Sequence, residues 1–254
     1  MHGRFTDNVS GFGAWVRRHW RALLSELIST ALLVLLGVAS LCPNGGQAAL
    51  TFGFVVAALV SAFGPVSGAH MNPAVSLAAL VYGQLDAPLA AAYAVAQLLG
   101  GVLGFGALKG LAPHEFPDGE AGCALPAAGV ALGAAAAVEA LLMAVLALVC
   151  CAVWATHDPA RPDHGAPIKL GITVAALVLA GGHLSGAGLN PARALGPAVI
   201  QNSWRAHWVY WVGPLLGAAA AAALCRWALL PPPKRAARDR QADAELPLTD
   251  KADR

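Results

Sequence analysis

Residues 64–74 read GPVSGAHMNPA and residues 182–192 read GHLSGAGLNPA, so the chain carries nearly the same string twice. Each copy ends in Asn-Pro-Ala, in which the asparagine can cap a helix and the proline fits its first turn. We therefore predict short helices at about 72–81 and 190–200. One Asn-Pro pair is usually only a helix start, but two in matched surroundings indicate an internal duplication with a shared role.

The composition indicates that most of the chain lies in a membrane. Of its 254 residues, 57% are hydrophobic and 12% are charged, against about 25% charged in an ordinary soluble domain. A helix needs about 20 mostly apolar residues to cross the bilayer, and six apolar segments approach or exceed that length. They fall at about 20–41, 49–64, 88–110, 127–155, 166–182 and 206–230. We therefore predict an all-α membrane protein.

The two copies of the repeated string are expected to enter the membrane from opposite sides. Each half holds three spans, an odd number, so the second half is inverted relative to the first. The amino ends of the two short helices then meet near the midplane, where irregular backbone is tolerated only if it is buried or lines a wet cavity. We predict six transmembrane helices, two re-entrant half-helices, an inverted 3+3 repeat and an aqueous pore.

The chemistry of this meeting point favours neutral solutes. The side-chain oxygens of Asn72 and Asn190 can cap their helices while the amide groups donate hydrogen bonds to passing water. Two positive helix ends that face one another disfavour cations and excess protons. Glu26 and Glu139, one in the first span of each half, are expected to hold the loop backbones as hydrogen-bond acceptors rather than to relay protons.

The placement of lysine and arginine predicts the topology. Basic residues precede the first span, separate spans four and five, and follow the last span, at Arg17, Arg18, Arg21, Arg161 and 234–240. Both termini are therefore expected in the cytoplasm. As a separate expectation, we assign the protein to the plasma membrane. We divide the chain into a cytoplasmic N-terminal segment (1–19), a channel domain (20–230, with halves at about 20–110 and 127–230) and a disordered cytoplasmic tail (231–254).

The paired Asn-Pro-Ala boxes resemble those of the aquaporins, the major intrinsic protein family, and the resemblance covers about residues 20–230. The residues that carry it are Asn72, Pro73, Ala74, Asn190, Pro191, Ala192 and Arg193, together with Glu26, Gln97 and Glu139. The resemblance implies the aquaporin fold, a pore in every subunit and a homotetramer in the lipid bilayer. It also implies a passive channel for water and other small uncharged solutes, with no cofactor.

The resemblance further implies a constriction made by Phe52, Val178, Ala187 and Arg193. In the family the matching arginine donates hydrogen bonds and repels cations, and an arginine at membrane depth generally faces water or a partner. Val178 stands where strict water channels usually have histidine, which removes a donor and leaves a smaller, apolar wall. Ala187 adds little bulk. We therefore expect a wider pore than that of a strict water channel.

Two branches of the family are similar to the chain in different ways. The run from Ala180 to Ala194 is similar to the ammonia- and peroxide-permeable branch that includes the eighth vertebrate aquaporin, although Phe52 stands where that branch has histidine. Glycerol facilitators usually carry aspartate after the pore arginine, where this chain has Ala194. We expect passage of water first, then of ammonia, hydrogen peroxide or urea. The alternative is a glycerol-permeable, aquaglyceroporin-like channel.

The remaining candidates for function are weaker. His183 is expected to miss the lumen, and His70 is expected to pack within its loop. An ion channel would need a ring of charge or of carbonyl groups, and a secondary transporter would need a further ionisable coupling site; the sequence supplies neither. It also holds no catalytic triad, metal-ligand cluster or phosphate loop, so we expect neither an enzyme nor a metal site. The net charge of +2, without a basic face, implies no nucleic-acid partner.

Overall fold

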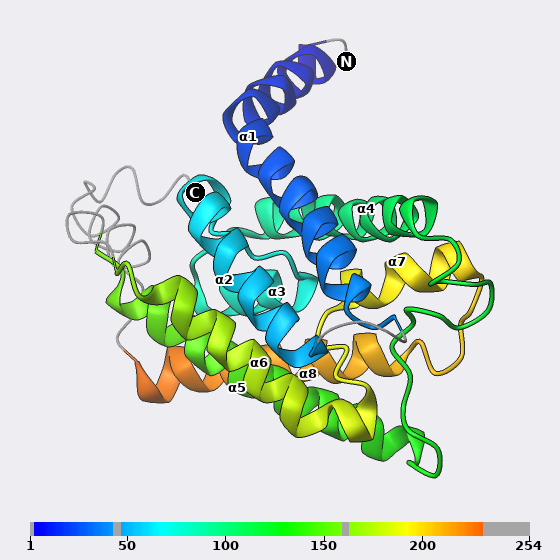
Figure 1. Cartoon of the computed structure of the whole chain (residues 1–254). Coiled ribbons are helices and arrows are strands. Elements are labelled where there is room, and N and C mark those ends of the chain that lie inside the picture. The colour runs from blue at the N-terminus through cyan, green and yellow to red at the C-terminus, as the bar shows by residue number, and fades with distance from the viewer. Residues whose placement is uncertain (1–2, 43–46, 159–162, 231–254) are drawn as a thin grey trace.

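The chain forms a bundle of long helices around two short ones (Figure 1). The computed structural model describes residues 3–42, 47–158 and 163–230, so the tail predicted at 231–254 lies outside the described residues. The elements in chain order are α1 (Gly3–Ala39), α2 (Ala48–Ser67), α3 (Pro73–Tyr82), α4 (Ala87–Leu111), α5 (Leu132–Thr156), α6 (Ala166–Ser185), α7 (Pro191–Gln201), α8 (Val209–Leu224) and the π-helical turn η1 (Cys225–Leu229). Within these residues no β-strand occurs.

Six of the helices are long and apolar enough to cross a membrane. They are α2, α4, α5, α6, the part of α1 from Gly11 to Ala39, and α8 together with η1. The short helices α3 and α7 have 10 and 11 residues, which corresponds to about 15 Å at the usual rise per residue. Since the hydrocarbon core of a bilayer is about 30 Å thick, neither crosses it alone. The predicted fold class, six transmembrane helices plus two re-entrant half-helices, is confirmed.

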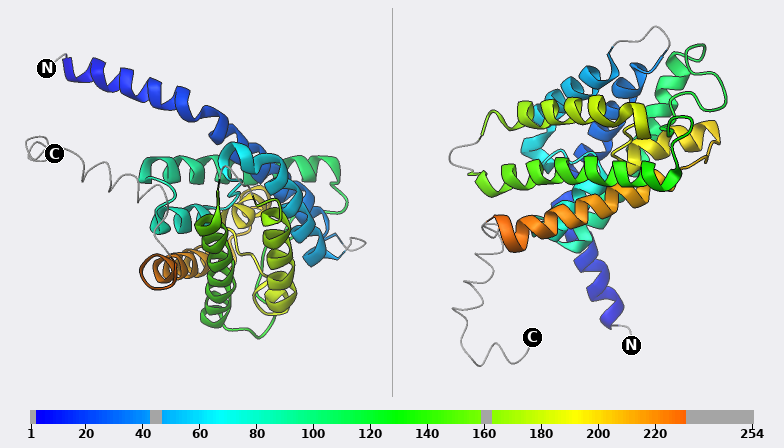
Figure 2. Two further views of the ribbon diagram at one scale, coloured as in Figure 1. Left: turned by 90° about the vertical axis from the view of Figure 1, so that its left-hand side faces the viewer. Right: turned by 90° about the horizontal axis from the view of Figure 1, so that it is seen from below.

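The helix ends differ from the prediction in places that matter for the site. Helix α2 continues to Ser67 and α6 to Ser185, one turn beyond the predicted ends. The reason is that Gly68 and Gly186 supply the left-handed caps, with φ of 89° and 83°. Helix α1 begins well before the predicted residue 20, and its first turns project beyond the other helices (Figure 2).

Corresponding helices pack alike in the two halves. The first and third spans of each half lie together, as α1 with α4 and α5 with α8, while the middle spans α2 and α6 pack across the halves. Gly53 of α2 and Gly171 of α6 face each other at this crossing, where a Cβ on either would meet the carbonyl oxygen of the other. The absence of side chains there allows the two helix backbones to approach closely.

The distribution of side chains is that of a protein with a lipid-facing exterior. Large apolar side chains are exposed along the long helices, among them Phe54, Val95, Leu103, Leu141, Ile172, Leu179 and Leu216. Several polar and charged side chains are buried instead, among them Glu26, Gln97, Glu139 and Arg193. Because ionisable groups at membrane depth face the interior of a bundle or a wet cavity, the buried polar set indicates where the functional site lies.

Candidate functional site

Helices α3 and α7 begin in the same way. Asn72 caps α3, and its Oδ1 accepts a hydrogen bond from the backbone N–H of Ala74 at 2.8 Å. Asn190 caps α7, and its Oδ1 accepts from the N–H groups of Ala192 at 2.9 Å and Arg193 at 3.3 Å. A proline follows each asparagine at the first helical position, where its missing N–H is not needed. Each box is therefore a complete helix start.

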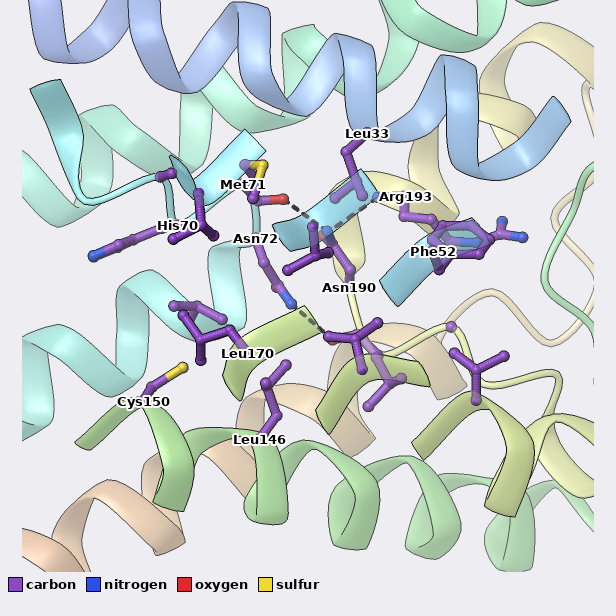
Figure 3. Close-up of a pocket in the computed structure, with 18 of the residues that line it drawn as sticks. Leu33, Phe52, His70, Met71, Asn72, Leu146, Cys150, Leu170, Asn190 and Arg193 are labelled. Carbon is purple, nitrogen blue, oxygen red and sulfur yellow. Dashed lines mark hydrogen bonds between the residues drawn. The ribbon is translucent and has the colours of Figure 1, made fainter. Parts of the chain in front are cut away.

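Each capping asparagine also reaches across to the loop of the other half. Nδ2 of Asn72 donates to the carbonyl oxygen of Leu189 at 3.0 Å, and Nδ2 of Asn190 donates to that of Met71 at 2.7 Å (Figure 3). The amino ends of α3 and α7 therefore meet. One amide hydrogen of each asparagine holds the opposite loop, which leaves at most one for a solute. The amide of Asn72 also lies 3.9 Å from Sδ of Met143, a weak acceptor.

The loops that lead into α3 and α7 share an unusual backbone. Ala69 and Met71 have φ of 48° and 53°, and the corresponding Ala187 and Leu189 have φ of 44° and 56°. Residues other than glycine rarely adopt positive φ, and each such residue costs roughly 1–3 kcal/mol. The same two positive φ angles recur in both halves, so the loop geometry requires them and other contacts must stabilise it.

A buried carboxylate stabilises the first loop from behind. Glu26 of α1 has no exposed surface. Its oxygens accept hydrogen bonds from the N–H groups of His70 at 2.9 Å and Met71 at 2.8 Å. They also accept from the hydroxyl of Ser67 at 2.6 Å and from the amide of Gln97 at 2.7 Å. Four donors around one carboxylate compensate for its removal from water.

Glu139 of α5 holds the second loop in the same manner. It is fully buried and accepts from the N–H groups of Gly188 at 2.9 Å and Leu189 at 2.6 Å, and from the hydroxyl of Ser185 at 2.7 Å. Neither this glutamate nor its counterpart in the first half lines the cavity described below. Their positions support the predicted role as acceptors for the loop backbones over a role in proton relay.

A tyrosine anchors each loop, and sequence reasoning missed both. The hydroxyl of Tyr93 donates to the carbonyl oxygen of Ser67 at 2.9 Å, and that of Tyr210 donates to the carbonyl oxygen of Ser185 at 2.6 Å. One signal was available in the sequence, because each tyrosine follows its Asn-Pro-Ala box at a similar distance within the third span of its half. The contact itself requires the folded arrangement.

A cavity runs past the two boxes. Its volume is about 90 Å³, counted as space open to the centres of water molecules, which is several times the roughly 10–15 Å³ that one water needs. Figure 3 shows Asn72 and Asn190 near the middle, His70 toward one side, and Phe52 and Arg193 toward the other. We call these sides the His70 end and the Arg193 end.

The Arg193 end brings together the four residues predicted to form the constriction. Phe52, Val178, Ala187 and Arg193 all line the cavity. Nη1 of Arg193 donates to the carbonyl oxygen of Gly122 at 2.9 Å, in the loop between α4 and α5. The Phe52 ring centroid lies 5.8 Å from Cζ of the arginine. A guanidinium carries five N–H donors, so donors remain for molecules in the cavity.

The His70 end differs from the sequence interpretation. His70 packs in its loop as expected, but it also lines the cavity, so the packing role alone is incomplete. Its Nδ1 lies 3.1 Å from the hydroxyl of Ser76, and its ring meets the ring of Tyr93 edge-on at a centroid distance of 5.4 Å. Trp154, near the end of α5, contacts the same imidazole at a centroid distance of 5.7 Å and lines the cavity too. The sequence interpretation did not single out this tryptophan.

His183 takes no part in the cavity wall. It was predicted to lie in the loop that enters the pore, but α6 extends through it and its side chain is exposed. Its expected absence from the lumen agrees with the described lining residues, which do not include it. In the described part of the chain, no group of three His, Cys, Asp or Glu is placed to hold a metal ion.

Comparisons with known proteins agree with this geometry. The sequence profile described as Major intrinsic protein matches residues 15–225. The chain is 43% identical to the lens fiber major intrinsic protein of Gallus gallus over 218 residues, which cover 84% of this chain and 82% of that protein. It is 39% identical to aquaporin-5 of Sus scrofa, with 83% and 82% covered, and 36% identical to aquaporin-8 of Mus musculus, with 80% and 79% covered.

A solved structure shares the fold. The aquaglyceroporin from Plasmodium falciparum has a TM-score of 0.73 to this chain at 22% sequence identity. The match covers 83% of this chain and 97% of the other. At this identity the likeness concerns the helical architecture and not the solute.

Proposed function

The chain belongs to the major intrinsic protein family, the aquaporins, and from this premise we propose that it conducts water and other small neutral solutes while excluding ions and protons. As a member of that family it is a passive membrane channel for water or small solutes. One observation carries the finer proposal. The reciprocal hydrogen bonds of Asn72 to Leu189 and of Asn190 to Met71 bring two capped helix starts to the wall of one cavity.

Three features support exclusion of ions. The amino ends of α3 and α7 carry partial positive charge, and they meet beside the cavity. Arg193 adds a full positive charge at one end. No carboxylate lines the cavity among the residues that the structure describes, so a cation that gives up its hydration shell finds no negatively charged side chain to compensate. Water keeps hydrogen bonds from the asparagine amides, which is the general basis of selectivity in aquaporin-type pores.

The wall at the Arg193 end supports passage of more than water. Val178 and Ala187 are small and apolar, and they offer neither bulk nor side-chain donors. We propose that ammonia, hydrogen peroxide or urea follow water, and that glycerol passage is the alternative. Phe52 and Arg193 are the larger residues of this constriction.

We further propose that residues 20–230 act as the channel domain of a homotetramer in the plasma membrane, with both termini in the cytoplasm. Support comes from the exposed arginines Arg17, Arg18 and Arg21 near the middle of α1, which precede its most apolar part, since basic residues favour the cytoplasmic side. Protease protection in sealed vesicles tests the topology. Light scattering coupled to gel filtration in detergent tests the tetramer.

Reconstitution into liposomes tests the proposed water flux. Stopped-flow light scattering after an osmotic step should show shrinkage much faster than in empty liposomes. Val178→Trp, which would place an indole in the cavity, should abolish the gain. Leu179→Trp is the matched control, because Leu179 is 63% exposed on the outer face, and it should leave water flux unchanged. Equal fluxes through the two variants would show that water does not pass this cavity.

The same liposomes test the order of solutes. Inward gradients of ammonia, urea and glycerol are applied in turn, and the rate of re-swelling, or of internal pH change for ammonia, is divided by the water rate. We expect ammonia and urea to pass faster than glycerol. A glycerol rate equal to that of urea would favour the aquaglyceroporin-like alternative.

A further inference from the structure

The aromatic side chains of the cavity wall are confined to its two ends. Phe52 lies at the Arg193 end and His70 at the other (Figure 3). Trp154 lines the cavity and packs against His70, so it belongs to the same end. The other described residues of the wall supply aliphatic and sulfur-containing side chains, loop backbone, the two capping asparagines and Arg193. The bulkiest side chain on the wall, the indole of Trp154, is therefore far along the pore from the constriction that sequence comparison indicates.

The imidazole at this end is held rigidly. The backbone N–H of His70 donates to Glu26 at 2.9 Å, and Nδ1 of its ring lies 3.1 Å from the hydroxyl of Ser76. The ring of Tyr93 packs against it edge-on. Because the backbone is fixed and one ring nitrogen has a buried partner, the ring cannot turn aside for a passing solute without losing its contact with Ser76.

The indole is held as well. Trp154 packs against His70 at a centroid distance of 5.7 Å and stacks on Tyr82 at 6.3 Å. Tyr82 has no exposed surface, so it gives the indole a fixed base. The aliphatic residue Leu170 of α6 lines the cavity on the His70 side of the two asparagines (Figure 3). A solute at this end meets aromatic faces and aliphatic side chains in a wall that does not yield easily.

We propose that Trp154 and His70 form a second constriction, and that Trp154 is a specificity-determining residue that limits solutes larger than water. This inference rests on the proposed function as a channel for small neutral solutes. Val178 makes the Arg193 end permissive, and Trp154 restores discrimination at the opposite end. A polyol or an amide must lose most of its hydrogen bonds to water in order to pass the indole face. A water molecule in single file keeps its hydrogen bonds to the water molecules before and after it.

Trp154→Leu tests this proposal in reconstituted liposomes. Removing the indole should raise the urea and glycerol rates relative to the water rate by about tenfold, since a change of even one methylene at an apolar contact discriminates by about that factor. Trp227→Leu is the matched control. Trp227 lies on η1, is 72% exposed and does not line the cavity, so its variant should keep the wild-type ratios.

Two further variants separate selectivity from packing. Trp154→Phe keeps a ring against its neighbours and should give a smaller rise in the same ratios. In the double variant Val178→His and Trp154→Leu, the Arg193 end should again limit large solutes, so the whole rise should disappear and the ratios should match those of Val178→His alone. A purely structural role of Trp154 would not produce this dependence.

The outcomes are distinguishable. Unchanged solute-to-water ratios in both Trp154 variants, with water flux retained, would overturn the second constriction and leave the proposed function intact. Absence of water flux through the wild-type protein would overturn the proposed function and this inference together.

Discussion

In the first half of the molecule the carboxylate of Glu26 accepts four hydrogen bonds, whereas Glu139 in the second half accepts three. The additional donor is Gln97, whose amide also donates to the hydroxyl of Ser76 at 2.9 Å. That hydroxyl in turn contacts Nδ1 of His70. A chain of buried polar groups therefore links the first carboxylate to the cavity wall.

The second half has apolar residues or no side chain in the same places. Ala194, Pro214 and Gly188 occupy the positions that correspond to Ser76, Gln97 and His70. Arg193 replaces the valine of the first half and supplies the polar group at its own end. The shared parts, which are the caps, the carboxylates and the loop geometry, build the fold. The parts that differ set the chemistry of each end of the cavity.

Removal of either buried carboxylate, Glu26 or Glu139, should have the largest effect on stability. Each alanine variant leaves buried donors without an acceptor, at roughly 1–3 kcal/mol per donor. We expect Glu26→Ala to lower the free energy of unfolding by about 4 kcal/mol or more, and Glu139→Ala by about 1 kcal/mol less, because one donor fewer is orphaned. Thermal unfolding midpoints in detergent show which variant is less stable. A midpoint lower for Glu139→Ala than for Glu26→Ala would contradict this account of the two halves.

The loop of the second half has no room for a side chain at Gly188, the position that corresponds to His70 in the first half. A Cβ at Gly188 would press into the ring of Tyr210, which is fixed by its hydrogen bond to Ser185. Overpacking of this kind costs about 1–3 kcal/mol, so Gly188→Ala should lower the unfolding midpoint. Gly182→Ala is the control, since its Cβ would meet only Val178, at 4.0 Å. Similar midpoints for the two variants would show that the ring moves aside.

The Arg193 end should become narrower when histidine replaces Val178. Val178→His adds bulk and a donor to the cavity wall, and we expect it to lower the urea and glycerol rates relative to the water rate by about tenfold. Stopped-flow measurements on the reconstituted variant provide the ratio. An unchanged ratio would mean that Val178 does not set the width of this end, and the division of selectivity between the two ends would fail.

The smallest expected effect concerns the outer loop of the Arg193 end. Arg205 donates to Glu120 at 2.6 and 2.8 Å and lowers the pKa of that carboxyl below its ordinary value of 4.5. A lowered pKa means that the pair stabilises the fold above pH 4.5 and that this contribution is lost as the pH falls through the lower, folded value. Both groups are exposed to solvent, so the effect is small and screened by salt.

The difference in unfolding midpoint between the wild type and Glu120→Gln measures this contribution. It should be present at neutral pH and shrink as the pH falls below 4.5 through the lowered pKa of the carboxyl. A difference that grows on acidification would show that the carboxyl is not stabilised by its arginine.

Much of the architecture could be predicted because its signals are local. Apolar segments long enough to span a bilayer and the repeated boxes at Asn72 and Asn190 are visible in the sequence, and the inversion follows from an odd number of spans. The ends of α2 and α6 were predicted about one turn too early, because the apolar segments stop at 64 and 182, whereas the left-handed caps are Gly68 and Gly186.

The candidate site was predictable only in part. Phe52, Val178, Ala187 and Arg193 line one cavity, in agreement with their predicted grouping, although their role in selectivity stays a prediction. The pair of His70 and Trp154 could not be found from the sequence, because the two residues come from distant segments and meet only when the first loop packs against the end of α5. The loop-anchoring tyrosines were missed for the same reason.

The central claim is that two inverted boxes make one pore that passes water and refuses charge. The most direct test measures osmotic water flux and proton flux in the same liposomes, with light scattering for the first and a trapped pH-sensitive dye for the second. We predict water flux far above that of empty liposomes and proton flux no greater than theirs. Water flux equal to that of empty liposomes, or proton flux that rises with the amount of protein, would contradict the account.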